Sequence, residues 1–134
     1  MSRLIGIFGS SGFGREVASL IRSDRSDELD GGKIVFVELA AAAPINGLDV
    51  VSQEDFLASD ADRVFTIAIA DCAIRRKLFE TALESGAQPL GVRARSAEVF
   101  GPTNIGSGEI LCSHSTVTCN TDIGRGFHLN VSSY

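Results

Sequence analysis

Aliphatic residues recur at every sixth position in the last third of this chain. The series consists of Val99, Ile105, Leu111, Val117, Ile123 and Leu129. An α-helix repeats about every 3.6 residues and a β-strand about every 2, so neither produces this spacing. A six-residue repeat is typical of a solenoid in which each hexad supplies a short strand with an inward aliphatic side chain, followed by a turn of small residues.

A longer repeat supports the same interpretation. Residues 99–116 align with residues 117–134, placing Ile105-Gly106 over Ile123-Gly124. Three hexads form one triangular coil, which predicts two coils of a left-handed parallel β-helix. Solenoid coils bury their faces against neighbouring coils and need a polar cap at the end. The chain reaches Tyr134 without such a cap. We therefore expect the natural protein to continue beyond Tyr134.

The first part of the chain has a different pattern, in which short apolar segments alternate with helical ones. We expect strands at residues 3–8, 33–38 and 63–70, and helices after the first strand, at residues 52–58 and from Asp71 onward. This alternation predicts an α/β domain with a parallel, Rossmann-like sheet covered on both faces. We place this domain at residues 1–95 and the start of the β-helix at residues 96–134.

Composition narrows the class of protein. Hydrophobic residues make up 44% of the chain and charged residues 22%, which is typical of a soluble globular protein. The net charge of -5 argues against a nucleic-acid binder. Without a long apolar segment or a secretory leader, we expect a cytoplasmic protein with no membrane partner. Cys72, Cys112 and Cys119 form no CxxC pair, so we expect buried free thiols and no metal site.

A glycine-rich turn follows the first expected strand. It reads Gly9-Ser10-Ser11-Gly12-Phe13-Gly14 and opens the first expected helix, where backbone amides and the helix N-terminus face a phosphate in dinucleotide-binding proteins. We interpret it as a candidate phosphate site. The alternative is a tight turn that binds nothing.

Two further positions are candidate ligand contacts. Asp71 is the expected N-cap of a helix whose first turns carry Arg75, Arg76 and Lys77. Cations there oppose the helix dipole, which an anionic ligand would offset, although the side chains could also extend into solvent. Glu38, at the end of the second expected strand, could accept hydrogen bonds from a ribose or base, or could be an ordinary surface carboxylate.

Three segments together resemble the sialic acid O-acetyltransferase and bacillosamine N-acetyltransferase (NeuD/PglD-type) family of hexapeptide-repeat sugar acyltransferases. They are GSSGFGREV from Gly9, AIADCAIRRK from Ala68, and His128-Leu129-Asn130. The resemblance covers essentially the whole chain. It implies a homotrimer whose N-terminal domain holds a nucleotide-activated sugar and whose β-helix groove between subunits holds acetyl-CoA.

The resemblance assigns nucleotide-sugar binding to the glycine turn, through Gly9, Gly12 and Gly14 with the intervening Ser10, Ser11 and Phe13. The family usually has a histidine where this chain has Phe13. It also commonly has an acidic pair where this chain has Glu38 followed by Leu39.

Asp71 and Arg75 match the family's second turn and its basic position, whereas Cys72 replaces the more usual asparagine. The resemblance also places the family's catalytic histidine beyond Tyr134. Asn130 matches an active-site asparagine near the acceptor, and its alternative role is that of a turn residue.

The chain has two histidines that could act as a catalytic base. Neither His114 nor His128 is followed by the acidic residue that the family places beside its base. His128 is kept as a second catalytic candidate that lines the subunit groove. His114 is interpreted as a corner or surface residue.

The predicted function is acetyl-CoA-dependent acetylation of an amine or hydroxyl of a nucleotide-activated sugar. The chain as it stands is expected to be inactive, because the catalytic histidine and the acetyl-CoA coils are missing from it. Two alternatives stay open. One is an NAD-binding oxidoreductase domain that uses the glycine turn and Glu38. The other is a non-catalytic scaffold that binds a nucleotide and trimerises.

Overall fold

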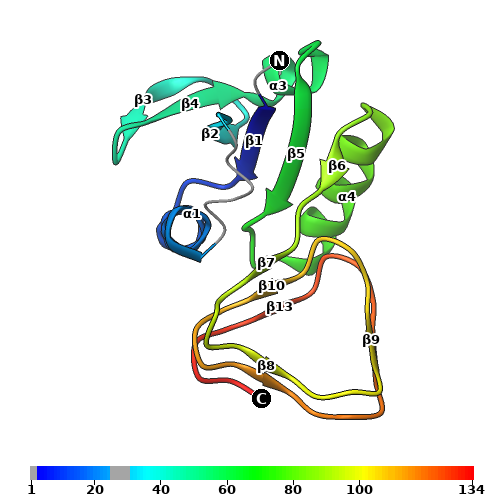
Figure 1. Cartoon of the computed structure of the whole chain (residues 1–134). Coiled ribbons are helices and arrows are strands. Elements are labelled where there is room, and N and C mark those ends of the chain that lie inside the picture. Colours follow the sequence, from blue (N-terminus) through cyan, green and yellow to red (C-terminus); the bar gives the residue numbers. More distant parts are fainter. Residues whose placement is uncertain (1–2, 25–30) are drawn as a thin grey trace.

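The N-terminal part of the chain forms a six-stranded sheet. A computed structural model describes residues 3–24 and 31–134 (Figure 1). The sheet strands are β1 (Arg3–Phe8), β2 (Lys33–Glu38), β3 (Ala42–Ile45), β4 (Leu48–Ser52), β5 (Asp62–Ile67) and β6 (Gln88–Pro89). The helices are α1 (Gly12–Asp24), α3 (Gln53–Ala58) and α4 (Cys72–Glu84). The strand order is β3-β4-β2-β1-β5-β6, and every neighbouring pair of strands is parallel except β3 and β4.

Both faces of this sheet are buried, as its nearly continuous apolar strands predict. Along β2, Ile34 and Phe36 point into one core with the apolar face of α1, whereas Val35 and Val37 point into a second core with α3 and α4. The alternation follows from the two-residue period of a strand. The predicted Rossmann-like sheet covered on both faces is therefore confirmed.

Helix boundaries follow the predicted caps. The Ser52 hydroxyl accepts the Asp55 N–H at 3.1 Å at the start of α3, and the Asp71 carboxylate accepts the Ile74 N–H at 3.0 Å at the start of α4. These bonds satisfy amides that have no partner inside the helix. The hairpin β3–β4 is absent from the sequence prediction, although its Asn46-Gly47 turn, with φ of 51° and 77°, is a strong hairpin signal.

The remaining strands, which we call the coil region (residues 92–134), stack in parallel below the sheet (Figure 1). Their bounds are β7 (Val92–Arg93), β8 (Glu98–Val99), β9 (Thr103–Ile105), β10 (Ile110–Leu111), β11 (Thr116–Val117), β12 (Thr121–Ile123) and β13 (His128–Leu129). Each pairing joins residues eighteen apart, such as Thr116 with Glu98 and Thr121 with Thr103. The predicted eighteen-residue repeat is thus the register of the coils, while their left-handed winding and number stay predictions.

Burial of the repeating aliphatic residues depends on their place in the stack. Leu111 is completely buried, because β10 pairs with β7 on one side and β13 on the other. Val99, on a strand paired on one side alone, is 36% exposed. Two corners repeat the same left-handed backbone one coil later. His114 and Ser132 have φ of 58° and 57°, and Gly108 and Gly126 have φ of 76° and 70°.

The expectation of buried cysteines is wrong for two of the three. Cys112 is buried beside β10, but Cys72 and Cys119 are exposed. Cys72 is the first residue of α4, and Cys119 lies at a corner of the coil region. Neither residue belongs to a hydrophobic cluster among the described residues, whereas Cys112 is part of the core that also contains Val92 and Ile110.

One hydrophobic core joins the sheet to the coil region. The buried face of α1, which includes Val17 and Ile21, belongs to the same cluster as Val92 and Ile110. The Asp24 carboxylate at the end of α1 also accepts the Arg95 N–H at 2.8 Å. These contacts orient the C-terminal edge of the sheet toward the coils (Figure 1).

Candidate functional site

The glycine turn closes tightly between β1 and α1. Gly9 has a φ of 105°, which favours glycine, and donates its N–H to the Val37 carbonyl at 3.1 Å. A Cβ on Gly14 would lie 1.9 Å from the Gly9 carbonyl oxygen. Only glycine at position 14 therefore allows α1 to approach the turn this closely. Gly12 faces open space, with no atom within 4 Å of its ideal Cβ position. The start of α1 is therefore accessible to a ligand.

Glu38 is bound to this turn. Its Oε2 accepts the Ser10 backbone N–H at 2.9 Å and the Ser10 hydroxyl at 2.5 Å. Arg15 donates from Nε to the Ser10 carbonyl at 3.0 Å. Two predicted binding residues are thus brought together, and Glu38 fixes the turn through one of its two carboxylate oxygens.

The turn also contacts the coil region through Phe13. Its ring lies against the ring of His128 on β13, with the centroids 4.7 Å apart. His128 Nδ1 is buried and has no hydrogen-bond partner. Burial lowers the pKa of His128 below its ordinary value of 6.5, and the positive charge of Arg75 lowers it further. His128 is accordingly a neutral imidazole near neutral pH, beside the predicted nucleotide-sugar turn.

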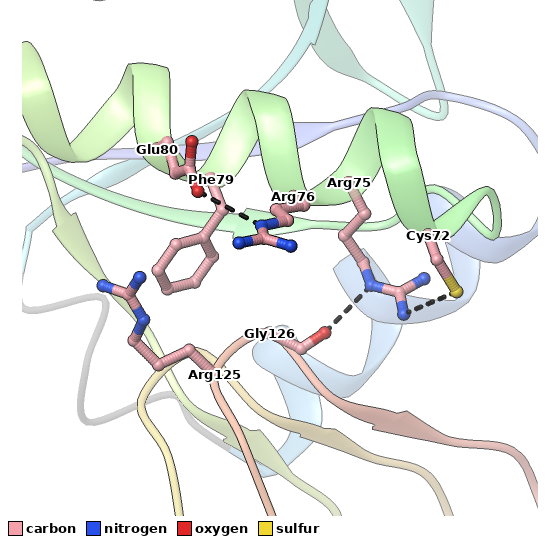
Figure 2. A pocket seen from close by; sticks show the side chains of 7 residues that line it. All are labelled: Cys72, Arg75, Arg76, Phe79, Glu80, Arg125 and Gly126. Atoms are coloured by element: carbon pink, nitrogen blue, oxygen red, sulfur yellow. Dashed lines mark hydrogen bonds and ion pairs between the residues drawn. The ribbon is translucent and has the colours of Figure 1, made fainter.

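Arg75 joins the second predicted turn to the coil region. Its Nη1 donates to the Ile69 and Ala70 carbonyls at 3.0 and 3.1 Å. Its Nε donates to the Gly126 carbonyl at 2.9 Å, as Figure 2 shows. Bonds from a charged donor are stronger than neutral ones. Arg75 therefore holds the end of β5 against a coil corner. The carboxylate of the neighbouring Asp71 caps α4.

Asn130, the other catalytic candidate, lies apart from these contacts. It follows β13 at an exposed corner, and its carbonyl accepts the Ser133 N–H at 3.2 Å. His114, as expected, is an exposed corner residue.

Sequence reasoning missed the role of the Arg125-Gly126 corner, which faces α4. One signal was present in the eighteen-residue alignment. Arg125 stands where the preceding coil has Ser107, whereas Gly126 repeats Gly108. The change from serine to arginine between the two coils indicated that this corner has a neighbour that the preceding corner lacks.

The lowered pKa of His128 has a measurable consequence for stability. Below pH 6.5 the unfolded chain takes up a proton at this residue that the folded chain resists, so the free energy of unfolding decreases as the pH falls. Above pH 6.5 the contribution is fully present. We expect His128→Gln to flatten the dependence of Tm on pH below 6.5. His114→Gln, at an exposed corner, is the control for the substitution itself. An unchanged slope in His128→Gln would contradict the assignment.

Comparisons with known proteins decide the family. Residues 4–82 match the model of the PglD N-terminal domain. The chain belongs to the PglD N-terminal domain family. The resemblance inferred from the glycine turn and the hexads is therefore confirmed, and the matched part of this PglD-type chain includes the turn from Gly9 to Gly14.

Similar proteins extend over both parts of the PglD-type chain. It is 36% identical over 134 residues to a GDP-perosamine N-acetyltransferase of Escherichia coli O157:H7, with 98% of this chain and 61% of that protein covered. The structure of WeeI from Acinetobacter baumannii AYE superposes with a TM-score of 0.91 at 35% identity, covering 99% of this chain and 63% of that one.

The acetyltransferase domain of PglB from Neisseria gonorrhoeae FA1090, in complex with acetyl coenzyme A, has the same fold. Its TM-score is 0.83 at 24% identity, with 100% of this chain and 65% of that chain covered. The PglD-type chain thus spans less than two thirds of the length of these relatives.

Within residues 3–24 and 31–134, no group of three or more His, Cys, Asp or Glu side chains is arranged to hold a metal ion. The same part of the chain contains no helix that is long and apolar enough to cross a membrane.

Proposed function

We propose that this chain provides the nucleotide-sugar-binding domain and the first coils of an acetyl-CoA-dependent sugar N-acetyltransferase. The observation that carries the proposal is the 36% identity to a GDP-perosamine N-acetyltransferase over 98% of the chain. The accessible start of α1, beside coil residues that approach the glycine turn, supports it. As the resemblance implies, the functional unit would be a homotrimer with acetyl-CoA in the groove between subunits.

The residues divide into three roles. The turn from Gly9 to Gly14, with the N-terminus of α1, would bind the diphosphate through backbone amides. Glu38 shapes that turn through Ser10 and would face the nucleoside. Asp71 and Arg75 hold the second turn at the same edge of the sheet, so they would position the sugar.

Acetyl transfer requires a sugar amine to attack the thioester carbonyl while a base removes the amine proton and the coenzyme A thiolate leaves. Neutral His128 and the amide of Asn130 would lie on the acceptor side of this reaction. His128 has the protonation state of a base near neutral pH. We propose that nucleotide-sugar binding is the part of this activity that the glycine turn and the neighbouring strand ends perform.

Binding is therefore the measurement that tests the function. We expect calorimetric titration to show binding of GDP-perosamine or another nucleotide-linked amino sugar. Gly12→Ala should weaken it by about 10-fold or more without lowering Tm, because the new methyl group occupies the space where the phosphate would approach. Gly124→Ala, also in open space, is the matched control. Saturation by NAD with no binding of nucleotide sugars would instead favour the oxidoreductase alternative and overturn the proposal.

A further inference from the structure

A cavity of about 280 Å³ lies between α4 and the Arg125-Gly126 corner of the coil region. Figure 2 shows the side chains that line it. They are Cys72, Arg75, Arg76, Phe79, Glu80, Arg125 and Gly126. Three of these seven residues are arginines and one is acidic, so the walls of the cavity carry a clear excess of positive charge.

The three guanidinium groups differ in their availability. Arg75 is bound to the Ile69, Ala70 and Gly126 carbonyls, so it contributes a fixed charge. Arg76 forms a 3.3 Å pair with Glu80, but its side chain is 83% exposed, and such a surface pair is weak. Its donors are therefore available to a stronger acceptor.

Arg125 approaches the cavity from the opposite side. Its guanidinium carbon lies 5.4 Å from the centre of the Phe79 ring, a cation–π contact that holds the side chain at the cavity. Phe79 is itself 4% exposed and belongs to the core between the sheet and the helices α3 and α4. Its ring is therefore held in place by packing and gives Arg125 a fixed contact surface. Arg76 from α4 and Arg125 from the coil region therefore line the same cavity.

Positive charge in this place is only partly compensated without a ligand. The Asp71 carboxylate caps α4, but the first turn of the helix contains no acidic residue, and Arg75 and Arg76 lie near the positive end of the helix dipole. A phosphate group would balance both the dipole and the guanidinium charges, and the planar fork of arginine suits its oxygens. We propose that this cavity is a second anion site, which binds a phosphate or diphosphate group separately from the glycine turn. The site shares the fixed charge of Arg75 with the second turn, but Arg76 and Arg125, whose donors would bind the anion, have no role in the proposed acetyltransferase function.

Inorganic pyrophosphate is the probe for this site. We expect the chain to bind it in calorimetric titrations, and the affinity to fall as sodium chloride is added. The double variant Arg76→Gln/Arg125→Gln should weaken binding by about 10-fold or more. Lys77→Gln is the matched control, because it removes the same charge from the same helix at a residue that does not line the cavity. It should keep the wild-type affinity.

Two further variants keep the test interpretable. Arg76→Gln alone changes an exposed side chain and should preserve the wild-type Tm while still weakening binding. Arg125→Lys retains the charge without the planar fork and should give an intermediate affinity. Failure of the wild-type chain to bind pyrophosphate, or an equal loss in Lys77→Gln, would overturn the proposal.

A parallel titration with GDP identifies the source of the phosphate. GDP affinity that survives in the double variant, while pyrophosphate affinity is lost, would support a separate site for another phosphorylated molecule. Equal loss of GDP and pyrophosphate affinity would overturn the separation from the glycine turn.

Discussion

Replacement of Gly14 by alanine is expected to lower the free energy of unfolding by about 3 kcal/mol or more. A Cβ at this position would lie 1.9 Å from the Gly9 carbonyl oxygen, and 2.8 Å from the Gly9 carbonyl carbon. Both atoms are backbone, so no side-chain rotation relieves the clash, and α1 must move away from the turn. Chemical denaturation followed by circular dichroism measures the loss.

Gly12→Ala is the control for this experiment, because it adds the same methyl group to the same turn where nothing lies within 4 Å. Its stability should remain within about 1 kcal/mol of the wild type. The close approach of α1 to the turn would be contradicted if Gly14→Ala and Gly12→Ala unfolded at the same denaturant concentration.

Replacement of Arg75 by glutamine is expected to cost about 2–4 kcal/mol of stability. The change removes the guanidinium that bonds to the Ile69, Ala70 and Gly126 carbonyls. The carbonyls would lose a charged donor in a partly buried junction. Besides the shift in denaturation midpoint, we expect faster amide hydrogen exchange around Gly126, whose N–H bonds to the Ser107 carbonyl at 3.0 Å.

Arg76→Gln controls for the loss of a charge on the same helix. Arg76 pairs with Glu80 at the surface, and the expected cost is below about 1 kcal/mol. Equal costs for the two variants would show that the contacts of Arg75 do not stabilise the junction.

Local patterns predicted most of the elements. The strands at residues 3–8 and 33–38 are confirmed with the predicted bounds, and the caps at Ser52 and Asp71 begin α3 and α4. The hexads predicted the eighteen-residue register of the coil region. These features depend on neighbouring residues or on a repeat, and both are visible in a single sequence.

Contacts between distant residues could not be predicted in this way. The predicted strand at residues 63–70 ends at Ile67, and the carbonyls of Ile69 and Ala70 bond to Arg75 instead of a neighbouring strand. Arg75 reaches Gly126 across 51 residues of sequence. Periodicity carries no information about such a pairing.

In the candidate site, too, the individual residues could be predicted from local patterns but the contacts between them could not. The glycine turn and Glu38 were identified from their places at the ends of strands, but their mutual bond through Ser10 was not. Predicting the contact between Phe13 and His128 would also have required the placement of the coil region relative to the sheet. Their assigned roles in binding and catalysis stay predictions.

The hydrophobic core that α1 shares with the sheet and the coil region limits how this chain could be rearranged. Val17 and Ile21 belong to the same cluster as Val92 and Ile110. A different solenoid grafted onto this α/β domain would need matching apolar side chains beneath α1, or it would leave that helix partly uncovered. The two halves are therefore not interchangeable modules, and substitutions on one side of the junction constrain those accepted on the other.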